Sequence, residues 1–283
     1  MFTRFFFGIS FLAHVVSYGA AASDYHSPRT ASLGGAGHAA PLLNDAMYLN
    51  PSFTSFLPSY SVAGNYDWFS YDGTDNTGKI LNVSVQDGRS DIFQAGFGFT
   101  RREDAEIFTL GASKAATKRL GFGLGGKFVK ANDGTDNGFQ DATASATFIA
   151  EDWLQLVLVV DNVVESQMAQ SYNFYREFVL GTKVNVMGIV MLYFDPHLAP
   201  DYPGSSFGTE MGAEFTLMQD LFLRLGYFNN SAIPEEAGVR GNGFAAGFGW
   251  IGPRMSIDYA FSKVLSPARG TSHVVGLTVY LGG

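Results

Sequence analysis

The chain has 283 residues, of which 46% are hydrophobic and only 16% are charged. Soluble domains usually carry about 25% charged residues, so this composition argues against an ordinary soluble protein. The net charge of −8 includes no basic run, which excludes nucleic acid as an expected partner. There is no cysteine, so disulfides and thiolate metal sites are excluded.

The N-terminal residues 1–22 have the pattern of a secretory signal peptide. Arg4 supplies the positive start, and an apolar stretch runs from Phe5 to Val16. Small residues at Ala20 and Ala22 provide a cleavage site before Ser23. No later window holds about 18 consecutive apolar residues, so no membrane-spanning helix is expected. The sequence therefore predicts an exported protein.

Residues 23–57 form the only part of the exported chain that does not alternate like a strand. The stretch from Leu33 to Ser52 is first rich in Gly and Ala, then briefly apolar, and closes on Asn50-Pro51. It is too short to be a domain. Two interpretations follow: a plug inside a barrel, or a linker that crosses the barrel floor once.

Residues 58–283 alternate with the period of two that is typical of β-strands with two different faces. Leu221, Leu223 and Leu225, for example, alternate with Arg224 and Gly226. One face is large and apolar, and the other is mostly Gly, Ser and Thr. A soluble sandwich would place more charges outside, whereas a transmembrane barrel places bulky residues against lipid and small residues in the lumen. The predicted fold class is all-β, a transmembrane antiparallel β-barrel.

Fourteen strands are predicted, and long and short connections alternate between them, as they do in outer-membrane barrels. The second strand has the weakest pattern, so twelve strands is the alternative. The predicted ranges are 59–71, 79–87, 91–101, 105–115, 119–131, 139–150, 153–162, 174–186, 188–196, 206–218, 220–229, 242–251, 253–262 and 271–281.

Several charges fall on the small-residue face, which is predicted to line the lumen. A charge facing lipid at mid-depth would cost about 2–4 kcal/mol for Lys or Arg, so the inward assignment follows from the barrel. Glu210 and Glu214 share one predicted strand and Arg224 lies on the next, which suggests a cross-strand ion pair. The network could brace the barrel or form a polar constriction. The predicted lumen charges are Lys127, Glu177, Lys183, Glu210, Glu214, Arg224 and Asp258.

Glycine is also frequent on this inner face, and strand glycines usually mark bends or a close backbone approach. An internal plug or tight curvature alone would each explain them. No catalytic constellation emerges, because the histidines are far apart and no Ser lies in a GxSxG turn. No enzyme activity, no cofactor and no metal site is expected.

The two ends of the chain resemble the outer-membrane barrels related to FadL and PorV. In that family a Gly-Gly-Ala stretch, a run ending in Asp-Ala and a closing Asn-Pro-Ala lead into the first strand. The corresponding residues here are Gly34-Gly35-Ala36, Asn44-Asp45-Ala46 and Asn50-Pro51-Ser52. Near the C-terminus, the sequence IDYAFS and the later Thr271-x-His273 look like the family's last hairpin.

The resemblance implies a bacterial outer-membrane channel for hydrophobic or amphipathic molecules, such as fatty acids or lipids, that is gated by an N-terminal hatch. The implied partners are outer-membrane lipid and a hydrophobic ligand in the lumen. One alternative is a structural or assembly barrel that forms a homo-oligomer and organises lipid; a third is a general porin for small solutes. The expected hatch residues are Gly34, Gly35, Leu42, Leu43, Asn44, Asp45, Asn50 and Pro51.

Overall fold

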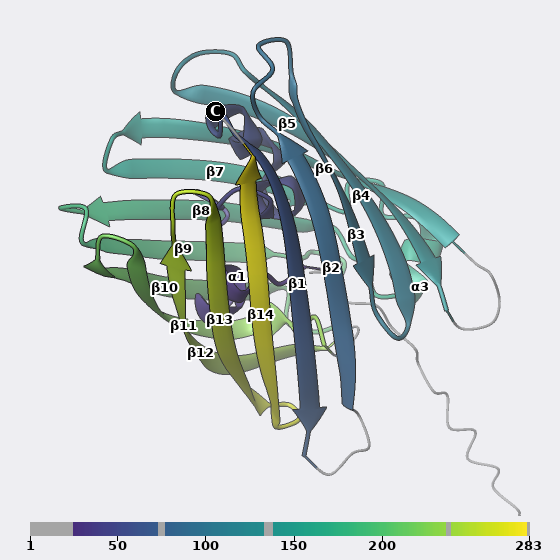
Figure 1. Ribbon diagram of the computed structural model, residues 1–283. Coiled ribbons are helices and arrows are strands. Elements are labelled where there is room, and N and C mark those ends of the chain that lie inside the picture. The colour runs from purple at the N-terminus through teal and green to yellow at the C-terminus, as the bar shows by residue number, and fades with distance from the viewer. Residues whose placement is uncertain (1–24, 73–76, 133–137, 236–238, 282–283) are drawn as a thin grey trace, which may run out of the picture.

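The computed structural model describes residues 25–72, 77–132, 138–235 and 239–281. The predicted signal peptide lies outside the described residues. The described chain forms one closed antiparallel barrel in which each strand pairs with its neighbours in sequence, and β1 pairs with β14 to close the ring (Figure 1). The strands are β1 (Tyr60–Tyr71), β2 (Thr77–Asp87), β3 (Gln94–Arg101), β4 (Ala105–Ala115), β5 (Leu120–Ala131), β6 (Gly138–Glu151), β7 (Leu154–Asp161), β8 (Glu177–Val186), β9 (Val190–Leu198), β10 (Phe207–Met218), β11 (Leu221–Ala232), β12 (Arg240–Ile251), β13 (Met255–Ser266) and β14 (Gly270–Leu281).

The prediction of fourteen strands is confirmed, and the twelve-strand alternative is wrong. β2, the strand with the weakest pattern, pairs in full register with β1 from Tyr60↔Asp87 to Ser70↔Thr77. The largest boundary difference lies at the end of β13, which continues to Ser266 beyond the predicted 262. Phe93, which the alternation placed in the third strand, lies in the turn before β3 and is 56% exposed.

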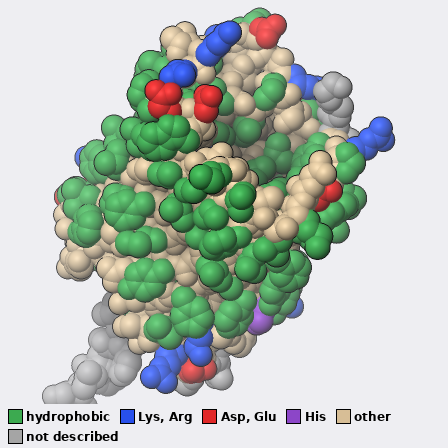
Figure 2. Space-filling model, turned by 90° about the vertical axis from the view of Figure 1, so that its left-hand side faces the viewer, with side chains coloured by type: hydrophobic (Ala, Val, Ile, Leu, Met, Phe, Trp, Pro, Cys, Tyr) green, Lys and Arg blue, Asp and Glu red, His purple; other side chains and the backbone are tan. Residues whose placement is uncertain are grey.

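The outer surface carries a broad apolar band, with charged side chains gathered near its two ends (Figure 2). Trp68, Phe97, Leu124, Phe248 and Leu277 are among the outward-facing residues of this band. The alternation of these residues with buried neighbours is the pattern that a lipid-facing barrel wall requires. Among the described residues, no helix is long and apolar enough to cross a membrane.

Two connections at the end of the barrel with the long loops fold into the lumen. The β7–β8 connection contains α3 (Gln167–Ser171), whose Ala169 packs with Phe174 against Ile107 and Phe139 of the barrel wall. The β11–β12 connection brings Ile233 against a second apolar cluster on the wall. The expectation of a uniformly small or polar inner face is therefore wrong at this end, because the inward-folded loops need apolar side chains to pack against.

The N-terminal residues Tyr25–Leu57, here called the plug segment, lie inside the barrel (Figure 1). Its elements are α1 (Pro28–Ser32), α2 (Asp45–Leu49) and the 3₁₀ helix η1 (Pro51–Phe56). α1 contacts β11 to β14, whereas α2 and η1 contact β3 to β6. The plug segment thus spans the lumen from one wall to the opposite one.

Candidate functional site

The plug segment begins with a short helix, α1, whose N-terminus is capped by its own side chains. The Ser27 side chain accepts a hydrogen bond from the backbone N–H of Thr30, and the Thr30 side chain accepts one from the backbone N–H of Ser27. Pro28 occupies the first helical turn, where its missing N–H has no consequence. This reciprocal capping fixes α1 although it is only five residues long.

A glycine turn after α1 presses the plug segment against the barrel wall. Gly34 and Gly35 adopt φ values of +69° and +91°, which residues other than glycine rarely adopt. A Cβ on Gly34 would lie 2.8 Å from the backbone nitrogen of Tyr227, and one on Gly35 would lie 2.7 Å from the Glu210 carboxylate. Both positions therefore require glycine for conformation and for space.

The wall opposite the plug segment is lined with glycine for the same spatial reason. A Cβ on Gly226 would lie 2.2 Å from the backbone nitrogen of Gly34, and one on Gly123 would lie 2.1 Å from that of Ser52. Gly98 leaves room for the ring of Tyr48, whose hydroxyl would lie 1.9 Å from an added Cβ. Of the two explanations for inner-face glycines, packing against an internal segment is thus the one that these positions satisfy.

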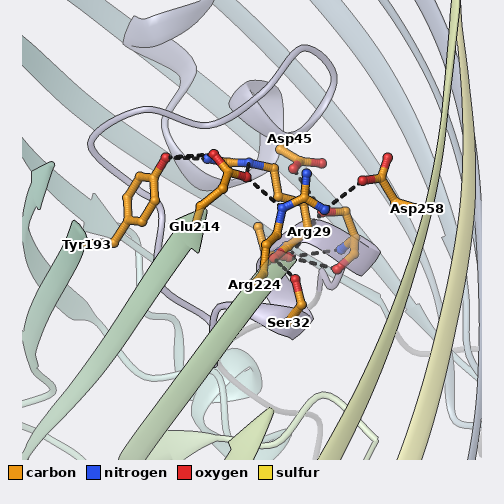
Figure 3. Close-up of polar contacts among 9 residues, drawn as sticks. Arg29, Ser32, Asp45, Tyr193, Glu214, Arg224 and Asp258 are labelled. Atoms are coloured by element: carbon orange, nitrogen blue, oxygen red, sulfur yellow. Dashed lines mark hydrogen bonds and ion pairs between the residues drawn. The ribbon is translucent and has the colours of Figure 1, made fainter. Parts of the chain in front are cut away.

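Arg29 joins the plug segment to an ion network on the wall (Figure 3). Its Nε donates to Glu214 Oε2 at 3.2 Å, and its Nη2 donates to the Tyr193 hydroxyl at 2.7 Å. Arg224 donates to the same Glu214 at 2.6 Å and to Asp258 at 2.6 Å. Two guanidinium groups and two carboxylates therefore balance in charge, which a water-poor lumen requires.

The predicted cross-strand ion pair forms between Glu214 and Arg224, which face each other in the β10–β11 register. Glu210 faces Phe228 instead and accepts a hydrogen bond from the Ser231 hydroxyl. The register therefore decides which of the two glutamates reaches the arginine.

His38 provides a second anchor between the plug segment and the wall. Asp195 Oδ2 accepts hydrogen bonds from the backbone N–H groups of Gly37 at 2.7 Å and His38 at 2.9 Å, and it lies 2.9 Å from His38 Nδ1. Burial alone would lower the pKa of His38, but the hydrogen bond and charge of Asp195 outweigh it and raise that pKa to about 9. His38 is accordingly a charged imidazolium at neutral pH.

Ligand atoms of His38, Asp195 and Glu210 all lie within 4.8 Å of one another, a spacing that could suit a metal ion. The donor set argues for an ion pair instead. Asp195 is already occupied by the backbone N–H groups of Gly37 and His38 and, through its other oxygen, by that of Thr182 at 3.3 Å. A protonated imidazole has no lone pair to offer a metal.

Asp45 closes the plug segment on itself. Tyr25 donates to Asp45 Oδ1 at 2.5 Å, and Ser27 donates to Oδ2 at 2.8 Å. Burial raises the pKa of Asp45 to about 6, although Tyr25, Arg29 and Ser27 each act to lower it. The buried Asp45 carboxyl group therefore ties the start of α2 to the residues that precede α1.

Two asparagines carry the polar contacts of the plug segment's second half. Asn44 donates to the Ser84 hydroxyl at 3.1 Å and accepts from the Ser61 hydroxyl at 2.6 Å. Asn50 donates to the His38 carbonyl at 2.9 Å and to the Thr147 hydroxyl at 2.8 Å. Each asparagine thus joins the plug segment to strands of the barrel.

The remaining expected hatch residues have supporting positions. Pro51 occupies the first turn of η1, where it starts the helix directly after Asn50. Leu42 and Leu43 are half-buried and line a cavity of about 30 Å³ between the plug segment and β1, β13 and β14. Leu43 adopts a positive φ of 44° at this bend.

The other predicted lumen charges lie on the wall away from the Arg29 network. Lys127 donates to Asp161 at 2.6 Å, and Glu177 accepts from Arg240 at 2.8 Å. Lys183 is half-buried within electrostatic range of Glu214 and, among the described residues, has no ion-pair partner within 4.0 Å. The seven charges therefore belong to several separate groups, not to one ring.

The free space left in the lumen is small and divided. Among the described residues, one cavity in the lumen has a volume of about 60 Å³ and is bordered by His38, Tyr48, Glu177, His197 and Glu210. An engineered apolar cavity that binds benzene has a volume of about 150 Å³, so this smaller and partly polar space suits a few water molecules better than an aromatic hydrocarbon.

Sequence reasoning missed several anchors of the plug segment, chiefly Arg29, His38, Tyr193 and Asp195. Arg29 and His38 carry charge within a segment otherwise read as apolar, which is a signal that could have been used. Tyr193, Asp195 and His197 alternate along β9 and all face inward, so strand parity also marked them. Their pairing with the plug segment depends on contacts across more than 150 positions in the chain.

The fold and the lumen define a class: a fourteen-stranded transmembrane barrel with an N-terminal segment packed inside it. No protein-family model matches the sequence, and no curated protein matches it. Solved structures do match. The Ralstonia pickettii toluene transporter TbuX superposes with a TM-score of 0.68 at 12% identity, over 92% of this chain and 99% of that one.

The monoaromatic hydrocarbon channel CymD gives a TM-score of 0.67 at 11% identity, over 95% of this chain and 99% of that one. A Pseudomonas aeruginosa FadL homologue gives 0.60 at 11% identity, over 90% of this chain and 97% of that one. The chain therefore has the fold of the FadL-type outer-membrane barrels, and the resemblance noted in the terminal motifs is confirmed at the level of the fold.

Proposed function

We propose that this protein is an outer-membrane channel for hydrophobic small molecules, and that the plug segment holds it closed. The observation that carries the proposal is a lumen filled by a segment anchored through ion pairs, within the fold shared with TbuX and CymD. Those two proteins are named as a toluene transporter and a monoaromatic hydrocarbon channel. In outer-membrane barrels of this kind, the long loops face the cell exterior and the short turns face the periplasm.

The lumen itself favours this function over a general porin. An open porin needs a continuous aqueous path, whereas the plug segment fills the lumen from wall to wall and leaves beside it a cavity of about 60 Å³. The two inward-folded loops also present apolar clusters at the exterior mouth, where Phe139 and Phe174 meet on one side and Phe228 and Ile233 on the other. These side chains are buried against one another and hold the two loops inside the mouth, and we propose that the molecule transported is hydrophobic, such as an aromatic hydrocarbon or a fatty acid.

The proposal is tested by uptake into cells that either contain or lack the protein, with radiolabelled toluene and oleate as the two hydrophobic probes. We expect faster uptake of at least one probe when the protein is present. Liposomes containing the purified protein serve as the porin control, since they should swell no faster in arabinose than empty liposomes do. Equal uptake of both probes with and without the protein would overturn the proposal, and rapid swelling in arabinose would favour the porin alternative.

A further inference from the structure

The short turns at one end of the barrel differ in chemistry between its two sides. In the β2–β3 turn, exposed Arg89 pairs with Asp87 at 2.8 Å. Between the β4–β5 and β6–β7 turns, exposed Arg119 pairs with Glu151 at 4.0 Å. Exposed charges are stable in water or among lipid headgroups and are unfavourable in hydrocarbon. The turns of β2 to β7 therefore lie outside the apolar part of the membrane.

The β8–β9 turn, residues 187–189, has only apolar side chains. Met187 is 91% exposed and Ile189 is 58% exposed. Met187 and Gly188 adopt positive φ values of 56° and 72°, a conformation for which turns usually select Asn, Asp or Gly. Local turn chemistry therefore gives no reason for a methionine at this exposed position, and the reason must lie in what surrounds it.

The adjoining β10–β11 turn extends the same apolar surface. Leu217 is 61% exposed and Met218 is 68% exposed. The backbone N–H of Thr216 donates to the Ile189 carbonyl at 2.9 Å, which holds the two turns side by side. The exposed Asp220 at the end of the β10–β11 turn bounds this surface. The surface is here called the apolar tip, and its residues are Val186, Met187, Ile189, Leu217 and Met218.

The apolar tip is continuous with the lipid-facing band of the barrel. Leu192 and Phe194 continue it along the outer face of β9, and the sequence from Val184 to Phe194 contains no charged residue. The β8–β9 and β10–β11 turns project to the left in Figure 1, and this side, seen face-on in Figure 2, is largely covered by apolar side chains. The apolar surface thus reaches from the band to the tip without crossing a charged boundary.

Lipid fits the apolar tip better than a protein partner does. Protein interfaces surround an apolar centre with a polar rim and carry direct hydrogen bonds. In the described parts of these two turns, the exposed polar side chains are those of Gln219 and Asp220, both at one edge. Acyl chains need no hydrogen-bonding group, and large exposed apolar patches mark membrane or protein contacts.

We propose that the apolar tip is immersed in the acyl chains of the membrane leaflet at the short-turn end, whereas the turns of β2 to β7 stand in water. Both sets of turns belong to one closed barrel, so the barrel is inserted at a tilt. The turns of β8 to β11 then stop inside a leaflet that the opposite turns cross completely. Tilting is a common way for a membrane protein to match its apolar surface to the bilayer. The proposal holds whatever the channel transports.

The chain has no cysteine, so single-cysteine variants report on one position each. Met187→Cys places a thiol in the apolar tip, and Lys118→Cys places the matched control in the exposed β4–β5 turn. Both full-length proteins are labelled with the fluorophore bimane and reconstituted into phosphatidylcholine nanodiscs, with or without bromine on the acyl chains. We expect brominated chains to quench bimane at position 187 and to leave it bright at position 118.

The reactivity of the unlabelled thiols gives a second measurement. Only the thiolate reacts, and apolar surroundings suppress it, so Met187→Cys should react with a charged, membrane-impermeant maleimide about tenfold more slowly than Lys118→Cys. The two should react alike after unfolding in guanidinium. Circular dichroism establishes that each variant is folded, and Leu217→Cys replaces Met187→Cys if the latter fails to fold.

Quenching together with slow reaction supports immersion in lipid. Fast reaction at position 187 without quenching would overturn the proposal and place the turn in water. Slow reaction without quenching would also overturn it, because a protein surface, such as a second copy of this chain, would then cover the apolar tip.

Discussion

Replacing Arg29 with methionine should shift the channel from closed to open. Arg29 is buried, and its guanidinium makes two hydrogen bonds that hold the plug segment to the wall, one to Glu214 and one to Tyr193. Hydrogen bonds that involve a charged group contribute about 1.5–3 kcal/mol each. Removing one partner of a buried ion pair typically costs about 3–5 kcal/mol.

The lower end of this range applies here, because Glu214 keeps its 2.6 Å contact with Arg224 and is not left unpaired. Methionine also preserves most of the buried side-chain volume. We therefore expect the docked state of the plug segment to become about 3 kcal/mol less stable relative to the displaced state. This corresponds to about a hundredfold increase in the ratio of open to closed channels.

Single-channel recording in planar lipid bilayers measures this ratio directly. The matched control is Arg89→Gln, because Arg89 forms an exposed ion pair with Asp87 and its guanidinium lies over Tyr60 of β1, not on the plug segment. We expect brief conducting events in the wild type, a large rise in open time for Arg29→Met and no change for the control. An open time for Arg29→Met within twofold of the wild type, in a correctly folded barrel, would refute the assignment of Arg29 as an anchor.

Two further predictions follow from the contacts of the plug segment, and a third concerns the oligomeric state. The pKa of His38 is raised to about 9 from an ordinary 6.5, so the imidazolium stabilises the docked plug segment fully below about pH 6.5 and loses this effect as the pH rises through about 9. The open time of the channel should therefore increase between these two pH values. Asp195→Asn should abolish this pH dependence. Gly226→Ala places a Cβ against the Gly34 backbone and should destabilise the docked plug segment by about 1–3 kcal/mol. Faster proteolysis of the plug segment would detect this change. The control Gly126→Ala, with nothing within 4 Å of the new Cβ, should behave like the wild type. If the barrel is a homo-oligomer, native mass spectrometry in mild detergent should give a multiple of the monomer mass. A strictly monomeric mass would exclude the homo-oligomeric assembly barrel.

The barrel was predictable because its pattern is repeated in every strand. Alternation such as Leu223-Arg224-Leu225 assigns each side chain to lipid or lumen, and the loop lengths then give the strand count. The exact ends were less predictable, since aromatic residues like Phe93 suit a turn at the membrane surface as well as a strand.

The contacts of the plug segment were harder to predict, because they depend on distance in space and not on local pattern. Glu210 and Glu214 have the same parity, yet only Glu214 reaches Arg224, since the register pairs those two positions. The Arg29–Glu214 contact joins residues 185 positions apart. The apolar inward-folded loops were missed because a long polar connection gives no sign of where it folds.

The seam between β1 and β14 also constrains how the protein is made. β14 is the last strand of the chain, and its Gly276 lies against Pro28 of the plug segment, where an added Cβ would lie 2.8 Å from the proline ring. β1 begins three residues after the plug segment ends. We therefore expect the N-terminal segment to be in place before the last strand pairs with the first during insertion into the membrane, so that the cylinder closes around its own N-terminus.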